Sequence, residues 1–131
     1  MTAVGSVDVE VLLIAWLRPQ LPGATVRAEL DNNLGNELPT VQIQRAGGDD
    51  DGFRLDRALV DVNVYAATRG AASVLSATVR GLLLTQLRGA ATGGAVVGHV
   101  STVSAPAWRP YENTGLRRVG ATYEIYLHPV P

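Results

Sequence analysis

The stretch RALVDVNVYAAT, residues 57–68, is the clearest strand signal in the chain, and the rest of the fold can be worked out from it. Side chains of a β-strand alternate between the two faces of a sheet, and this segment sorts by that period. One face is wholly apolar: Ala58, Val60, Val62, Val64 and Ala66. The other face is mixed: Leu59, Asp61, Asn63 and Tyr65. Because Asp and Asn are rarely buried in a single subunit, we expect this mixed face to meet water or a neighbouring chain.

Two helices are predicted, one on either side of this strand in the sequence. The later helix covers residues 70–88, and its inward stripe comprises Ala72, Leu75, Val79, Leu82, Leu83 and Gln86, flanked by Ala71 and Leu87. The earlier helix covers residues 6–18, with Ser6 as its N-terminal cap and Pro19 directly after its end. Trp16 is predicted to anchor this helix in the core.

Four further segments have the composition of strands, at residues 24–30, 39–46, 95–106 and 116–128. The predicted order is therefore α-β-β-β-α-β-β, within a single domain over residues 1–131. Strands that come in runs, rather than alternating with helices, indicate an α+β fold with a mainly antiparallel sheet. We expect the two helices to pack on one face of that sheet.

Composition excludes several classes of function. The chain has 131 residues, 11 basic and 12 acidic, and this balance argues against a nucleic-acid-binding protein with a basic face. It has no cysteine, so disulfides, thiolate nucleophiles and cysteine-based zinc sites are excluded. The apolar run at residues 11–17 is far shorter than the ~20 residues of a membrane-spanning helix, and we expect no membrane partner.

Three consecutive aspartates, Asp49, Asp50 and Asp51, lie in the segment RAGGDDDGF at residues 45–53. A calcium loop places its carboxylates at alternate positions with a distal Glu, a spacing that this segment lacks. A pair of catalytic carboxylates must be held together in a cleft, whereas the flanking glycines predict a mobile segment. We interpret the segment as a solvated loop between strands; a weak cation site and an interaction loop are the alternatives.

Known catalytic motifs do not account for the remaining polar residues. The two histidines, His99 and His128, lie outside any zinc-binding or nucleophile–base motif, and no phosphate-binding glycine loop is found. We therefore assign no catalytic, metal-binding or cofactor-binding residue. The enzyme alternative, a small metal-dependent or acid-base enzyme, would need a pocket that gathers Asp56, Asp61, Glu124 and His99 or His128.

A proline-bounded loop, APAWRPYENTG, is predicted at residues 105–115. It carries Trp108, Arg109 and Tyr111, which are the residue types that dominate interface hot spots. Its prolines stiffen the segment and so reduce the cost of ordering it on binding. Two interpretations stay open: a docking loop, or a tryptophan that folds back over the edge of the sheet.

The succession of these segments resembles a known family. The chain is similar to the small tail terminator, or tail completion, proteins of long-tailed bacteriophages and prophages. The similarity lies in an N-terminal helix followed in order by LPTVQIQRAGG, LDRALVDVNVYA, AASVLSATVRGLLLTQL and SAPAWRPYENTGLRRVGATYEIYL. The absence of lysine and the abundance of Arg, Ala, Gly and Val suit a high-GC genome, as in the actinobacterial members. The resemblance covers nearly the whole chain.

This resemblance implies a structural virion protein and not an enzyme. Such subunits form a ring, expected to be a homohexamer, that caps the tail tube, stops its polymerisation and offers a surface to the head-tail connector protein. It implies assembly in the host cytoplasm, a place at the head-proximal end of the tail, no cofactor, and DNA that only passes through the lumen.

The resemblance also gives the candidate residues a place in such a ring. The mixed strand face and the aromatic loop become candidate interfaces, and the Asp49–Asp51 segment would project towards the lumen or the tube. The runner-up is a head-to-tail connector or neck protein, and a monomeric binding module is a third reading.

Overall fold

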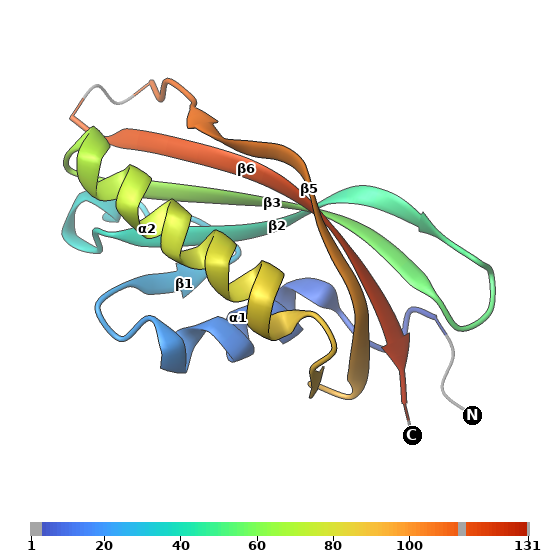
Figure 1. Cartoon of the computed structure of the whole chain (residues 1–131). Helices are drawn as coiled ribbons and strands as arrows, with labels where there is room; N and C mark the ends of the chain where they lie inside the picture. Colours follow the sequence, from blue (N-terminus) through green and yellow to red (C-terminus); the bar gives the residue numbers. More distant parts are fainter. Residues whose placement is uncertain (1–3, 113–114, 131) are drawn as a thin grey trace.

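The computed structural model describes residues 4–112 and 115–130, which form one six-stranded sheet with two helices on one face (Figure 1). The spatial order of the strands is β1-β2-β3-β6-β5-β4. Their bounds are β1 (Thr25–Arg27), β2 (Thr40–Asp50), β3 (Asp56–Ala66), β4 (Ala91–Thr92), β5 (Ala95–Trp108) and β6 (Arg117–Pro129). The β1–β2 pair is parallel and the other pairs are antiparallel. The predicted α+β fold with a mainly antiparallel sheet is therefore confirmed.

The helices are α1 (Val9–Leu17) and α2 (Arg69–Leu82), joined by short turns to the strands around them. A 3-10 turn η1 (Arg18–Gln20) follows α1, a second such turn η2 (Leu34–Asn36) lies between β1 and β2, and the π-helical turn η3 (Leu83–Leu87) continues α2. Figure 1 shows α2 running along the sheet with α1 beside it on the same face.

The core lies between these helices and the apolar faces of the central strands. The five residues predicted to form the apolar face of the 57–68 stretch are buried to 2% exposure or less, as their alternation predicts. They pack in one cluster with Leu13 and Leu17 of α1, and with Val79 and Leu83 of the second helical segment. Trp16 packs against the rim of this cluster and is only partly buried.

Two details of the predicted helices are wrong. The cap of α1 is Asp8 rather than Ser6: the Asp8 carboxylate accepts hydrogen bonds from the amides of Glu10 and Val11 at 2.8 and 3.3 Å. Gln86 was expected in the inward stripe but is exposed, whereas Leu87 is fully buried. The π turn explains this, because its wider hydrogen-bond spacing rotates the last residues relative to a 3.6-residue period.

Several segments outside the predicted strands are strands in the structure. A neighbouring strand supplies backbone hydrogen bonds to them even where their residues have a low propensity for β-structure. Residues 89–94, which lie between the predicted helix and the predicted strand at 95–106, contain β4, and β5 continues through Pro106 to Trp108. Three register shifts interrupt the pairing of β5 with β6. Part of the predicted 105–115 loop, at residues 113–114, lies outside the described residues.

Candidate functional site

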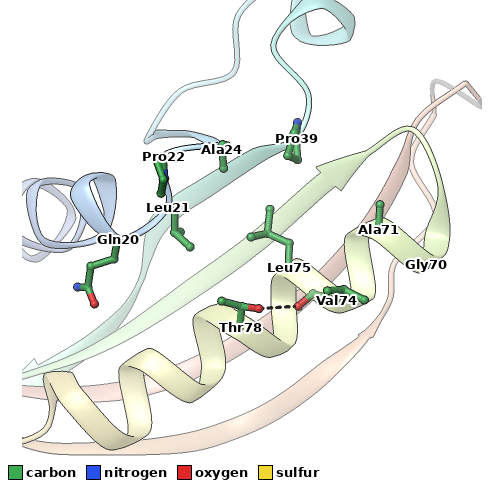
Figure 2. A pocket seen from close by; sticks show the side chains of 11 residues that line it. Gln20, Leu21, Pro22, Ala24, Pro39, Gly70, Ala71, Val74, Leu75 and Thr78 are labelled. Atoms are coloured by element: carbon green, nitrogen blue, oxygen red, sulfur yellow. Dashed lines mark hydrogen bonds between the residues drawn. The ribbon is translucent and has the colours of Figure 1, made fainter.

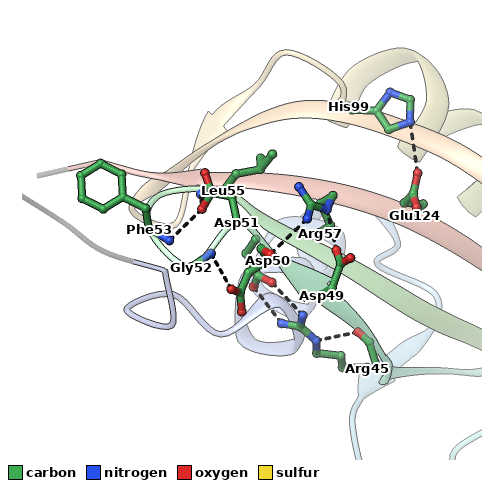
Figure 3. A network of polar contacts seen from close by, with 12 residues as sticks. Arg45, Asp49, Asp50, Asp51, Gly52, Phe53, Leu55, Arg57, His99 and Glu124 are labelled. Atoms are coloured by element: carbon green, nitrogen blue, oxygen red, sulfur yellow. Dashed lines mark hydrogen bonds and ion pairs between the residues drawn. The ribbon is translucent and has the colours of Figure 1, made fainter.

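The three aspartates lie on a hairpin arm, which we define as residues 45–57, formed by the end of β2 and the start of β3 (Figure 3). Asp49 and Asp50 belong to β2 and pair in register with Arg57 and Asp56 of β3. The Asp49 carboxylate also accepts a hydrogen bond from the guanidinium of Arg57. The expectation of a mobile loop is therefore wrong for these residues, because ladder pairing and side-chain contacts fix them.

Asp51 organises the turn of the arm. Its Oδ1 accepts hydrogen bonds from the amides of Phe53, Arg54 and Leu55 at 2.8, 2.9 and 3.0 Å. Bonds from the amides of Leu55 and Phe53 lower the pKa of Asp51 below its usual value, because they stabilise the charged carboxylate. This aspartate therefore has a structural role in closing the turn.

Arg45 and Asp56 hold the base of the arm. The guanidinium of Arg45 donates two hydrogen bonds of 2.7 Å to the Asp56 carboxylate, whose side chain is only 5% exposed. The hydrogen bond with Asp56 is the largest cause that raises the pKa of Arg45. The backbone amide of Arg45 donates to Glu10 of α1 at 2.7 Å, so the arm is attached to the helical layer as well.

Phe53 is an aromatic residue at the tip of the arm and is about half exposed. The residue is 49% exposed, and the guanidinium carbon of Arg54 lies 4.7 Å from the ring centroid. The backbone around the ring is fixed, because the amide of Val4 donates to the Phe53 carbonyl at 2.9 Å. The arm therefore presents this ring from an ordered turn.

The mixed face of β3 is not uniformly open, contrary to expectation. Tyr65 is 1% exposed and Asn63 is 7% exposed within the single subunit. Tyr65 is covered by Tyr111, whose ring stands edge-on at 5.2 Å, and its hydroxyl donates to Gln42 at 3.0 Å. Burial raises the pKa of Tyr65. Leu59 and Asp61 on the same face are half-buried, and the Thr122 hydroxyl donates to Asp61.

The aromatic segment was predicted as a proline-bounded loop that either docks a partner or folds back over the edge of the sheet. In the structure it is bound to the sheet. Arg109 lies flat over Gly120, where an added Cβ would come within 2.5 Å of the Arg109 Cδ, and its guanidinium donates to Asn63 at 3.2 Å. The guanidinium of Arg118 donates to the carbonyls of Arg109 and Pro110 and lies 5.2 Å from the ring centroid of Tyr111. Arginine thus covers the outer face here, which sequence alternation cannot reveal.

Trp108 ends β5 and remains partly exposed beside α2. The guanidinium carbon of Arg69, the first residue of α2, lies 5.1 Å from the Trp108 ring centroid. Of the aromatic segment's three candidates, Trp108 therefore lies beside the helical layer, whereas Arg109 and Tyr111 cover the opposite face of the sheet.

Of the residues of the enzyme alternative, His99 and Glu124 lie together, whereas Asp56 and Asp61 are engaged by other side chains. Asp56 is paired with Arg45, and Asp61 is bonded to Thr122. His99 lies 3.7 Å from Glu124 on the outer face, with the Tyr126 ring 4.7 Å away. Within residues 4–112 and 115–130, no three His, Cys, Asp or Glu side chains are placed to hold a metal ion.

An apolar groove that the sequence did not indicate runs between α2 and the segment that follows α1 (Figure 2). Its volume is about 530 Å³. One wall is the segment 20–24 together with Pro39, and the other is the first half of α2, including Ala71, Val74, Leu75 and Thr78. Val74 is 69% exposed on this wall. The available signal was an apolar Val74 outside the inward stripe of α2.

No helix in the described part of the chain is long and apolar enough to cross a membrane. The polar groups of the surfaces above are engaged in turns, ion pairs and sheet contacts, and two apolar features, Phe53 and the groove, are left open to solvent.

Comparison with known proteins gives the family. Residues 5–128 match the phage tail termination proteins, and the chain belongs to that family. A chain in the virion of a native gene transfer agent (GTA) particle has a similar fold, with a TM-score of 0.64 and 17% identity over 98% of this chain and 99% of that chain. No curated protein sequence matches the chain. Family membership gives the chain a structural role in a phage tail and a place in the virion.

Proposed function

We propose that the protein caps the end of a phage tail tube as a closed ring of identical subunits, stops growth of the tube and offers a surface for joining the head. The family match over residues 5–128 carries this proposal. Six copies per ring are proposed, and the partners are the tail tube protein on one side and a head-tail connector protein on the other. DNA would pass through the ring without being bound.

The geometry supports a ring for a second reason. A closed ring of identical subunits is built by head-to-tail contacts, which require two different patches on each subunit. The arm with Phe53 and the apolar groove are two different patches, and the arm and the N-terminal end of α2 lie at opposite ends of the subunit (Figure 1). Phe53 is 49% exposed and Val74 of the groove is 69% exposed, so each patch can contact a neighbouring chain.

The first test is the native mass measured by light scattering over a range of protein concentrations. One subunit has a mass of 13.8 kDa, and six would give about 83 kDa. A mass in that range supports the ring, and purified tail tube protein is then added to measure tube lengths. Tubes that stop growing when the ring is present support capping; tubes that grow unchanged contradict it.

A neck protein is the second candidate within the same machinery. Binding separates the two functions: the terminator binds the tail tube protein, whereas a neck protein binds the portal complex. A pull-down with each purified partner distinguishes them. The arginine-rich, lysine-free composition supports a high-GC, actinobacterial type of host as part of the proposal.

A further inference from the structure

The arm provides a preformed aromatic projection. Phe53 is 49% exposed, while the backbone on both sides of it is held by Asp51 and by the amide of Val4. Because the turn is already ordered, little conformational entropy is lost when the ring is buried by a partner. An aromatic side chain of this kind buries on the order of 150–250 Å² in a contact.

The groove has the properties of a receptor for such a ring. Its walls are mainly Leu, Pro, Ala and Val side chains, and its volume of about 530 Å³ lies in the range of protein binding pockets. Leu75 lies at the centre of the groove in Figure 2, between the wall formed by α2 and the wall formed by Leu21 and Pro39.

The charges of the two features are complementary. The arm, residues 45–57, carries four aspartates and three arginines, a net charge of −1. The two chain segments that carry most of the groove, 18–27 and 69–88, contain five arginines and no Asp or Glu. They are Arg18, Arg27, Arg69, Arg80 and Arg88. The charge of Arg27 is offset within the subunit by Asp31 and Glu37, at 3.6 and 3.1 Å. The groove also lies at the N-terminal end of α2, where the helix dipole is positive and the first turn holds no acidic residue.

The two features cannot meet within one chain. Figure 1 shows the arm at one end of the sheet and the N-terminal end of α2 at the other. The groove is lined by residues 70–78 at that end of α2. A contact between them must therefore join two copies. Repeated from copy to copy, it is a head-to-tail contact, which closes into a ring or extends into a filament.

We infer that the tip of the arm, with Phe53 as its central residue, docks into the apolar groove of the next subunit and forms the repeating contact of the ring. This inference rests on the proposed ring and specifies which surfaces build it. Asp49 and Asp50 then approach the arginine-containing segments 18–27 and 69–88 that flank the groove, and the ring of Phe53 is buried between Val74 and the 20–24 segment.

Thiol cross-linking tests the contact directly, because the chain has no cysteine of its own. The single variants Phe53→Cys and Val74→Cys are purified separately, mixed, and treated with a short bifunctional thiol reagent. We expect a covalent dimer in the mixture and little in either variant alone. In the matched control, Val103→Cys takes the place of Val74→Cys. Val103 lies on β5 and has a similar exposure, 56% against 69% for Val74. This control should give no dimer with Phe53→Cys.

A second variant measures the contribution of the aromatic ring. Phe53→Ser should raise the protein concentration needed for assembly by about tenfold or more, because burial of a Phe side chain contributes about 1.5–3 kcal/mol. Val103→Ser should leave that concentration unchanged. Since Phe53 is exposed in the single subunit, the folding of either variant is checked by circular dichroism.

The outcomes separate the contact from the ring. A ring mass without the Phe53–Val74 cross-link overturns the contact and leaves the ring intact. The mass of a single subunit at every concentration, alone and with tail tubes, overturns the ring. If Phe53→Ser keeps the ring mass but no longer binds tail tubes, the tip contacts the tube protein instead, and the inference is wrong.

Discussion

Arg45 and Asp56 are the residues on which the attachment of the arm depends most. The Arg45→Ala substitution leaves the nearly buried Asp56 carboxylate without its guanidinium partner. Loss of one partner of a fully buried pair costs about 3–5 kcal/mol. We expect a smaller loss of about 2 kcal/mol in the free energy of unfolding, because the Arg45 side chain is 34% exposed and water screens the pair. Urea denaturation measures it.

Arg57→Ala is the matched control at the same end of the molecule. It removes the contact with Asp49, whose side chain is 70% exposed, and should barely move the urea midpoint. Equal destabilisation by the two variants would contradict the structural role given to the Arg45–Asp56 pair.

The residue scale also shows what could not be read from the sequence. Alternation correctly placed the apolar residues of β3, but it left Asn63 and Tyr65 on an open face. Both are buried because Arg109 and Tyr111, nearly fifty residues later in the chain, fold over them. No local pattern carries that information, since the contact depends on where β5 and β6 bring the segment.

At the scale of elements, the turn of the arm is expected to respond to pH through Asp51. Because the pKa of Asp51 is lowered in the folded state, its carboxylate stabilises the turn fully when the pH is above the usual pKa of 3.8. This stabilisation decreases as the pH falls below 3.8, and it is lost once the pH has passed the lowered pKa of the folded state. We therefore expect the amides of Phe53 and Leu55 to be rigid from neutral pH down to about pH 4 and to become mobile in stronger acid.

Heteronuclear NOE measurements between pH 7 and pH 2 check this expectation. Asp51→Ala should make the same amides mobile at every pH, because the acceptor is gone. Asp50→Asn is the control, since Asp50 accepts the Gly52 amide at 2.7 Å and its variant keeps an oxygen acceptor. A turn that stays rigid in Asp51→Ala would show that the three amide bonds do not hold it.

Element types were largely predictable, whereas their ends were not. Both helices and the four longest strands follow from hydrophobic periodicity, which reflects the burial of one face. The ends of β2 and β5 extend through glycine, aspartate and proline, which are residues that disfavour strands. Antiparallel neighbours determined these ends: β3 pairs with β2 as far as Asp50, and β6 pairs with β5 as far as Trp108.

At the scale of the whole molecule, the proposed contact between arm and groove makes assembly sensitive to salt. The double variant Asp49→Asn and Asp50→Asn removes two negative charges and keeps Asp51 in the turn. We expect the wild-type ring to dissociate progressively as salt screens the attraction, and the variant to assemble less well at low salt with a flatter salt dependence. Light scattering between about 0.05 and 1 M salt measures both.

Placement of the acidic residues in the lumen predicts a different result. There the aspartates would repel the phosphates of passing DNA, so the variant would keep the wild-type mass and salt dependence while ejection of DNA slowed. If the wild type and the double variant assemble identically at every salt concentration, the charges of Asp49 and Asp50 do not contribute to the proposed contact.

The sequence by itself determined the α+β class and the apolar face of the central strand, because burial of one face imposes a regular spacing on the apolar residues of a segment. The succession of segments along the sequence also carried the resemblance to tail terminators. Tertiary structure alone decided that the aspartates sit on an ordered arm and that arginines cover the mixed face. It also alone decided that an apolar groove opens between α2 and the 20–24 segment. These features join residues far apart in the chain, and the free energy of such contacts depends on packing geometry that no single segment encodes.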